Sequence, residues 1–290
     1  MRIGLSSPIV VQVPGVSSPW EAGGTPEDLA AIAHTADVCG LEFLTCSEHI
    51  AVPTGEAATR GMVYWDPLST LGYLAAHTRR IRLTTAVLVL GYHHPLEIAK
   101  RYGTLDLLAA GRVILGVGIG SLSEEFDLIG ASWSQRAARA DDALGALRAA
   151  LGSAEPEYSG RFYSFGGMTV QPHAPRTQLP MWIGGRSEAS LRRAIRLADG
   201  WMPYGLAPDR IRSMLNEHAP AGAFEIVLGT GRPLNPSDDP DGTRRALANL
   251  TAAGATVVSC HLAARSAEDY CAQIARLAEI ASDMETPGDG

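Results

Sequence analysis

Residues 81–121 read IRLTTAVLVLGYHHPLEIAKRYGTLDLLAAGRVILGVGIGS, and this stretch decides the fold class. It begins with an apolar, β-branched run, Ile81 to Leu90, and ends with a second one, Arg112 to Val117. Pro95 between them begins a helix of roughly four turns, so the stretch is a strand–helix–strand unit. Both strands are apolar almost throughout instead of alternating, which is typical of parallel strands covered on both faces.

The strand–helix alternation continues on both sides of this unit. Eight strands are predicted, each followed by a helix, at residues 2–5, 41–46, 81–90, 112–117, 180–183, 200–203, 223–229 and 256–260. The first helix is well delimited, because Thr25 fits an N-cap, Asp28 completes a capping box and Gly40 fits the end. Eight alternations without an internal boundary predict an α/β fold, the (β/α)8 TIM barrel. A doubly wound open sheet is the alternative, since sequence does not show closure.

We predict one domain over residues 1–284 and a loose tail over residues 285–290. An insertion at about residues 155–179 separates the fourth helix from the fifth strand, and YSGRFYSF followed by GGMTVQP indicates a hairpin with a turn at Gly166–Gly167. A long loop, Ile50 to Trp65, follows the second strand. Loops after strands form the working face of a barrel, so we expect this loop to be a pocket wall.

Composition excludes several classes of protein. Of the 290 residues, 46% are hydrophobic and 19% charged, which supports a sizeable core. The net charge of −7 argues against a general nucleic-acid surface. We identify neither a signal peptide nor an apolar run long enough for a membrane span, and the four cysteines form no CxxC pair. A cytoplasmic protein with reduced thiols and no membrane partner is predicted.

Three blocks of the sequence resemble the luciferase-like flavin and deazaflavin oxidoreductases. They are DPLSTLGYLAAHTRRIRLTTAVLVLGYHHPLEIAKRYGTLDLLAAGRVILGVGIG at 66–120, EYSGRFYSF at 157–165 and PMWIGGRSEASLRRAIRLADGWMP at 180–203. The pattern is most similar to the branch that uses the deazaflavin coenzyme F420. The resemblance implies a homodimer with a tricyclic cofactor across the C-terminal mouth of the barrel. For the flavin mononucleotide (FMN) alternative it also implies a separate reductase that supplies reduced cofactor.

The resemblance places the cofactor over the ends of the first four strands. The residues that it implies for cofactor binding there are Ser6, Ser47, Thr85, Ala86, Val87, Gly118, Ile119, Gly120 and Ser121. Many members have a non-prolyl cis peptide after the third strand, and Ala86–Val87 is the matching bond. The segment Gly184-Gly185-Arg186-Ser187 is predicted as an anion site on chemical grounds as well, with a glycine turn beside a surface arginine as the alternative. Helix N-terminal N–H groups and a guanidinium both favour phosphate there.

Two departures from the family pattern bear on the substrate and the cofactor. Some deazaflavin sugar dehydrogenases place a glutamate where this chain has Ser121, which argues against sugar dehydrogenation. Luciferase-type monooxygenases place a phosphate-binding arginine where this chain has Ile119, which argues against FMN.

Glu48 and His49 end the second strand, where deazaflavin members often have an acidic residue and a histidine. We predict them as the catalytic residues, with His49 bonding a substrate or moving a proton after hydride transfer. A solvated His49 at the rim is the alternative, as is a Glu48 that points into the scaffold. Candidate substrate contacts, or equally loop anchors, are Trp20, Met62, Tyr64, Trp65 and Tyr204.

The expected function is hydride transfer between F420 and a small organic substrate. The alternatives are a reduced-FMN-dependent monooxygenase and a barrel that binds flavin or deazaflavin without turnover. No metal is expected, because His93, His94 and Glu97 lack a further ligand set and His94 reads as a helix entry. An aldolase-like barrel is disfavoured, because the only lysine, Lys100, lies within a predicted helix.

Overall fold

Eight parallel strands close into a barrel in the computed structural model, which describes residues 1–176 and 178–285. The strands are β1 (Arg2–Leu5), β3 (Phe43–Cys46), β5 (Arg82–Thr85), β7 (Val113–Gly118), β10 (Met181–Gly184), β11 (Gly200–Met202), β12 (Glu225–Gly229) and β13 (Val257–Cys260). Strand β1 pairs with both β3 and β13, and the pairing of β10 with β7 closes the ring. The predicted (β/α)8 barrel is confirmed, and the open-sheet alternative is wrong.

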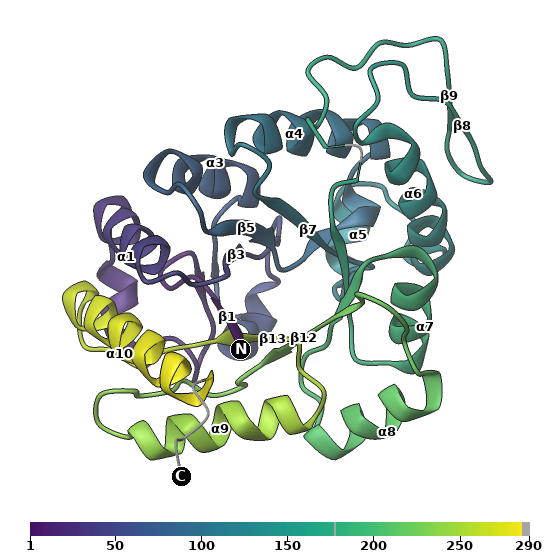
Figure 1. Cartoon of the computed structure of the whole chain (residues 1–290). Coiled ribbons are helices and arrows are strands. Elements are labelled where there is room, and N and C mark those ends of the chain that lie inside the picture. Colours follow the sequence, from purple (N-terminus) through teal and green to yellow (C-terminus); the bar gives the residue numbers. More distant parts are fainter. Residues whose placement is uncertain (177, 286–290) are drawn as a thin grey trace.

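Long helices form an outer ring around these strands (Figure 1). They are α1 (Pro26–Val38), α3 (Pro67–His77), α4 (Pro95–Leu108), α6 (Arg136–Ala150), α7 (Glu188–Leu197), α8 (Pro208–His218), α9 (Pro240–Ala252) and α10 (Ala267–Glu285). The predicted capping box is present, since Thr25 accepts from the Asp28 N–H and the Asp28 carboxylate accepts from the Thr25 N–H. Residues 286–290 of the predicted tail lie outside the described residues. Among the described helices, none combines the length and apolar character needed to cross a bilayer.

Shorter elements lie in the loops, and several depart from the predictions. They are the 3-10 helices η1 (Pro19–Gly23), η2 (Thr54–Glu56) and η3 (Leu90–Tyr92), the helices α2 (Ala57–Arg60) and α5 (Ser123–Leu128), and the strands β2 (Val11–Gln12), β4 (Val63–Tyr64), β6 (Leu88–Val89), β8 (Tyr158–Ser159) and β9 (Ser164–Phe165). The segment Ile50 to Trp65, predicted as a loop, contains η2, α2 and β4. Strand β4 pairs antiparallel with β2, so the loops after β1 and β3 are tied together. Two-residue strands have no periodicity of their own and depend on a partner distant in sequence.

The run Ile81 to Leu90, predicted as one strand, is divided into β5 and β6. The peptide bond between Ala86 and Val87 at the division is cis, as the family resemblance implies. A continuous apolar run carries no local mark of this division. Pairing of both pieces with β7 defines it, at Leu83↔Val113 for β5 and Leu88↔Val117 for β6.

The insertion before β10 forms a hairpin, but its predicted turn is wrong. Strands β8 and β9 pair directly, and the turn lies at residues 160–163, where the Gly160 N–H donates to the Tyr163 carbonyl, instead of at Gly166–Gly167. Asp142 on α6 explains the position. Its carboxylate accepts from the N–H groups of Arg161, Phe162 and Tyr163 at 3.2, 2.6 and 2.9 Å. A helix outside the hairpin therefore determines the turn.

Large side chains fill the inside of the barrel below its mouth. A separate buried cluster consists of Phe43, Ile114, Trp182, Val227 and Val257, each 0% exposed. The ring centroids of Phe43 and Trp182 are 5.4 Å apart in an edge contact, and the Trp182 indole N–H donates to Glu225 at 2.7 Å. A filled interior is usual for this fold. Because side chains fill the interior, a ligand can bind only outside it, and the C-terminal mouth is the face where this fold binds ligands.

Candidate active site

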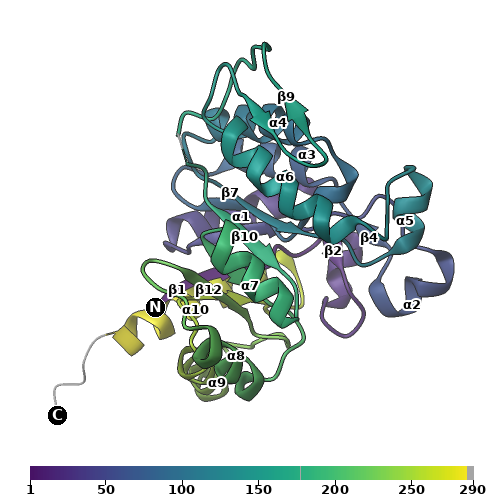
Figure 2. The same cartoon turned by 90° about the vertical axis from the view of Figure 1, so that its right-hand side faces the viewer.

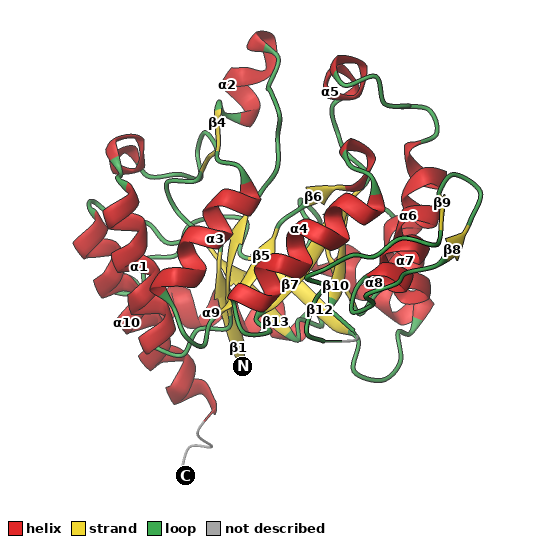
Figure 3. Ribbon diagram, turned by 90° about the horizontal axis from the view of Figure 1, so that it is seen from above, coloured by secondary structure: helices red, strands yellow, loops and turns green. Residues whose placement is uncertain are grey.

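A cavity of about 490 Å³ opens at the C-terminal ends of the barrel strands. All eight strands contribute to its wall at or just after their last residues, through Ser6, Ser47, Ala86, Gly118, Gly184, Met202, Gly229 and His261. Figure 2 and Figure 3 show α2 and α5 projecting from the same end of the barrel. The C-terminal end is the face that carries active sites in this fold.

The structure brings most of the predicted site residues together around this cavity. Those in its wall are Ser6, Ser47, Glu48, His49, Tyr64, Ala86, Val87, Gly118, Ile119, Gly120, Ser121, Gly184, Gly185 and Tyr204. Thr85 is buried, and its hydroxyl donates to the Gly116 carbonyl at 2.6 Å. Arg186 and Ser187 are exposed beside the cavity, with the Arg186 guanidinium 5.8 Å from the centroid of the Tyr204 ring. Thr85 therefore supports the strand end, while Arg186 borders the mouth.

Three predicted substrate residues are not part of the wall. Met62 is 77% exposed. Trp20 packs against Tyr270, with ring centroids 6.0 Å apart. The backbone of Trp65 is held by Val10, whose carbonyl accepts from the Trp65 N–H at 2.9 Å. The side chains of Trp20 and Trp65 are half-buried and packed against the hydrophobic core, which favours the loop-anchor alternative for both.

Val87 is seated between two glycines of neighbouring strands. A Cβ atom on Gly118 would lie 2.6 Å from Val87 Cγ2, and one on Gly184 would lie 2.6 Å from Val87 Cγ1. Both distances are far below van der Waals contact, so these glycines make room for the Val87 side chain. The Ser47 hydroxyl fixes the preceding residue by donating to the Ala86 carbonyl at 2.6 Å. The wall of the cavity here consists largely of backbone and one valine.

His49 is bound to a buried carboxylate on α5. Its Nδ1 lies 2.8 Å from Glu125 Oε2, which also accepts from the Tyr92 hydroxyl at 2.6 Å. Glu125 Oε1 accepts from the N–H groups of Ile50 and Ala51 at 2.6 and 3.2 Å, and Glu125 is 1% exposed. Burial raises the pKa of Glu125, but the bonds from His49, Tyr92 and Ala51 outweigh it and hold the pKa below its ordinary value. Glu125 is therefore a carboxylate at neutral pH.

Glu48, the neighbour of His49 in sequence, pairs with a different histidine. Its Oε1 lies 2.7 Å from His93 Nε2, and its Oε2 accepts from the Val89 N–H at 2.6 Å. The Glu48 side chain is 9% exposed. The carboxylate thus braces the β6 segment, and the predicted pair Glu48–His49 is divided between two separate carboxylate–histidine pairs.

Sequence reasoning missed several polar residues of the wall. Ser7 is buried, and its hydroxyl has no hydrogen-bond partner among the described residues. His261 follows β13 as His49 follows β3, and burial lowers the pKa of His261, so its ring is neutral at neutral pH. Arg60 on α2 donates to the Ser121 hydroxyl at 3.2 Å. Ser7 and His261 could have been predicted from the sequence, since both follow a predicted strand. No sequence pattern distinguishes Arg60 from the other residues of its loop.

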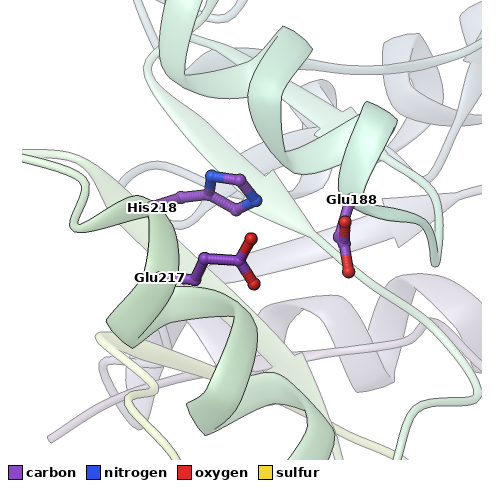
Figure 4. A group of neighbouring side chains, drawn as sticks. All are labelled: Glu188, Glu217 and His218. Atoms are coloured by element: carbon purple, nitrogen blue, oxygen red, sulfur yellow. The ribbon is translucent and has the colours of Figure 1, made fainter.

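A second cluster of polar side chains lies away from the cavity. Glu188, Glu217 and His218 come together where α7 and α8 meet, with ligand atoms within 4.8 Å of one another (Figure 4). The Glu188 carboxylate is already engaged by Arg210 and, at 3.7 Å, by Arg192. Two guanidinium groups beside one carboxylate oppose a bound cation, so we assign no metal to this cluster.

We expect the stabilising contribution of Glu125 to disappear in acid. Its pKa is lowered by folding, so the contribution is complete above the ordinary value of 4.5 and is lost as the pH falls through the folded-state pKa. The difference in unfolding free energy between the wild type and Glu125→Gln should therefore shrink as the pH is lowered. Urea denaturation across this range measures it, with the exposed neighbour Glu124→Gln as control. A difference independent of pH would contradict the lowered pKa.

The model of the luciferase-like monooxygenase family matches residues 1–235. The chain belongs to this family. An uncharacterised protein of Mycobacterium tuberculosis is 32% identical over 274 residues, which cover 89% of this chain and 94% of that protein. The F420-dependent glucose-6-phosphate dehydrogenase of Beutenbergia cavernae is 32% identical over 184 residues, 61% of this chain and 52% of that enzyme.

Two solved structures of related fold cover nearly the whole chain. The monooxygenase RslO1 from Streptomyces bottropensis has a TM-score of 0.81 at 22% identity and covers 99% of this chain and 100% of its own. An F420-dependent secondary alcohol dehydrogenase with an F420–acetone adduct has a TM-score of 0.71 at 14% identity, covering 96% and 97%. At these identities the likeness concerns the fold.

Proposed function

We propose that the protein is an oxidoreductase that holds coenzyme F420 at the mouth of the barrel and exchanges a hydride with a small organic substrate. The observation that carries the proposal is the form of the cavity. One wall is backbone at Gly118 and Gly184 with Val87 between them, and the His49–Glu125 pair stands at its edge. A wall of glycine backbone that a planar ring can approach and a nearby proton-bearing group suit hydride and proton transfer together.

The residues of the cavity fit a planar deazaflavin with an anionic tail. Glycine backbone allows a flat ring to approach closely, and the buried Ser7 hydroxyl, which no described residue bonds, offers a hydrogen bond to a polar ring edge. Arg186 and the N-terminus of α7 would hold a phosphate, because N–H groups and a guanidinium meet there. When bound, F420 supplies two-electron hydride chemistry.

The protein's own part is to orient the ligands and to manage one proton. His49 Nδ1 is taken by Glu125, so Nε2 is the ring nitrogen left for a ligand in the cavity. In this role Nε2 takes up or releases the proton that accompanies hydride transfer. Val11, Val13 and Val16 add apolar wall to the same cavity, which would limit the water in it.

The choice of cofactor rests on the relatives and on two residues of this chain. The relative from Beutenbergia cavernae is named as F420-dependent, and Ile119 leaves no arginine at the position where luciferase-type enzymes bind phosphate. Ser121 replaces the glutamate of sugar dehydrogenases, and its hydroxyl is engaged by Arg60. The proposed substrate is therefore a small organic molecule other than a sugar phosphate.

One observation favours a second candidate, a reduced-FMN-dependent monooxygenase. The Arg60 guanidinium reaches Ser121 from α2, which brings a cation to the loop that Ile119 leaves uncharged. A phosphate bound at that loop would pair with Arg60. Under this second candidate, Arg60 would take the role of the arginine that luciferase-type enzymes have at the position of Ile119.

Titration with each cofactor separates the candidates. We expect fluorescence quenching and calorimetry to show F420 binding at least about tenfold tighter than FMN, a difference of about 1.4 kcal/mol. Arg60→Ala should weaken FMN binding more than F420 binding, because only the FMN alternative needs that cation. Tight FMN binding without F420 binding would overturn the proposal. F420 binding without turnover of any alcohol or carbonyl compound would favour a non-catalytic barrel.

A further inference from the structure

Glu125 bonds two different parts of the site with its two oxygens. Oε1 accepts the Ile50 and Ala51 N–H groups and so holds the start of the loop after β3. Oε2 accepts from the Tyr92 hydroxyl and faces His49 Nδ1. The first set of bonds is structural. The second acts on the side chain that borders the cavity, because His49 is part of its wall.

We propose that Glu125 is a positioning residue for His49, which fixes the ring with Nδ1–H toward the carboxylate and the Nε2 lone pair toward the cavity. An ionised carboxylate only accepts hydrogen bonds, so Nδ1 must carry the hydrogen in this contact. A neutral imidazole then has its lone pair on Nε2. The role goes beyond the proposed function by adding a residue from α5, and its catalytic meaning rests on that function.

The surroundings of the pair support an orienting role. The rings of His49 and Tyr64 meet edge to face with centroids 4.5 Å apart, so the imidazole is packed on one side and bonded at Nδ1. Glu125 is 1% exposed, which shields the contact from competing water. A carboxylate at Nδ1 also stabilises the imidazolium that forms when Nε2 takes a proton, as in other carboxylate–histidine pairs.

The pair of Glu48 and His93 provides a comparison within the same molecule. There the carboxylate faces Nε2 instead of Nδ1, and its other oxygen binds the Val89 N–H. A carboxylate at Glu48 therefore favours the Nε2–H tautomer of His93, opposite to the one proposed for His49. The same substitution at the two carboxylates should act on two different histidines.

Nitrogen NMR of the apo protein labelled at its histidines tests the assignment directly. The His49 signals are identified by their loss in His49→Asn. For the neutral ring of His49 in the wild type we expect the Nδ1–H tautomer. Glu125→Gln should introduce a substantial Nε2–H population, because a glutamine side chain can donate as well as accept. Glu48→Gln should leave the His49 pattern unchanged and alter that of His93.

The wild-type spectrum alone can overturn the proposal, whether or not Glu125→Gln folds. An Nε2–H tautomer for His49 in the wild type would do so, and so would unchanged His49 shifts in a folded Glu125→Gln. Tyr92→Phe removes one donor to the carboxylate but keeps the carboxylate, and it should keep the Nδ1–H tautomer. A purely structural role for Glu125 would affect melting temperature without moving these shifts.

Kinetics then connect the tautomer to the proposed function. Glu125→Gln should lower kcat by about 10–100-fold with a smaller change in KM, because positioning affects the proton step more than binding. Its pH–rate profile should also change shape, which Tyr92→Phe should reproduce only weakly. If the protein binds no F420 but His49 shows the expected tautomer, the proposed function fails and the positioning role stands. The expected kinetics with unaffected His49 shifts would contradict the positioning role alone.

Discussion

His49→Asn is expected to lower kcat by about 10²–10⁴-fold, the usual contribution of a positioned acid or base. Asparagine retains a polar group of similar reach but cannot exchange a proton near neutral pH. The cofactor wall at Val87, Gly118 and Gly184 is untouched by the change. F420 affinity should therefore stay within about threefold of the wild type. Affinity would change more only if His49 also contributed to binding of the cofactor in the ground state.

Steady-state kinetics and calorimetry on the same preparation measure the two effects. His34→Asn is the matched control, because His34 is exposed on α1 and does not line the cavity. A parallel loss of turnover and cofactor affinity would show that His49 serves binding instead of proton transfer. Unchanged turnover would remove it from the mechanism.

Gly118→Ala is expected to weaken F420 binding by about tenfold or more. The new Cβ would lie 2.6 Å from Val87 Cγ2, so the valine or the strand end must move. Overpacking of this kind typically costs about 1–3 kcal/mol of folding stability unless the neighbouring atoms move. A loss of about 1.4 kcal/mol in cofactor binding at the displaced wall is a factor of ten in affinity. Val87 is part of the cavity wall, so displacing it changes the surface that the ring would contact.

Gly229→Ala is the matched control for this substitution. Gly229 also ends a barrel strand and lines the cavity, but its Cβ would meet its nearest atom, the Ser259 carbonyl oxygen, at 3.9 Å, an ordinary contact. Calorimetry with F420 and thermal melting of both variants separate affinity from stability. Equal affinities for the two variants would show that the Val87 seat does not shape the cofactor site.

Local sequence signals sufficed for the elements of the barrel. Apolar runs located the strands, and Thr25 and Asp28 located the start of α1, because capping bonds join residues three apart. The cavity position followed as well, since polar residues and glycines after strands collect at one end of a parallel barrel. The family resemblance added the cis peptide bond at Ala86–Val87 and the proposed cofactor class, which no spacing argument supplies.

Pairing between distant segments was outside the reach of the sequence. The hairpin turn depends on Asp142 of α6, and the strand β4 exists because β2 lies beside it. Aromatic residues in loops gave no sign of which of them would line the cavity: Tyr64 does, whereas Trp20 packs against Tyr270. These outcomes depend on contacts across tens of residues, which no local pattern records.

The residue His49 shows where the two kinds of information divide. Sequence by itself placed this histidine after the second barrel strand, at the mouth of the barrel, because strand ends are local features. Only the tertiary structure decided its partner, since Glu125 is 76 residues away and reaches it through the closure of the barrel and the placement of α5. Glu48, the sequence neighbour of His49, pairs with His93. Neighbouring side chains diverge at a strand end, so hydrogen-bond partners there come from other elements of the fold.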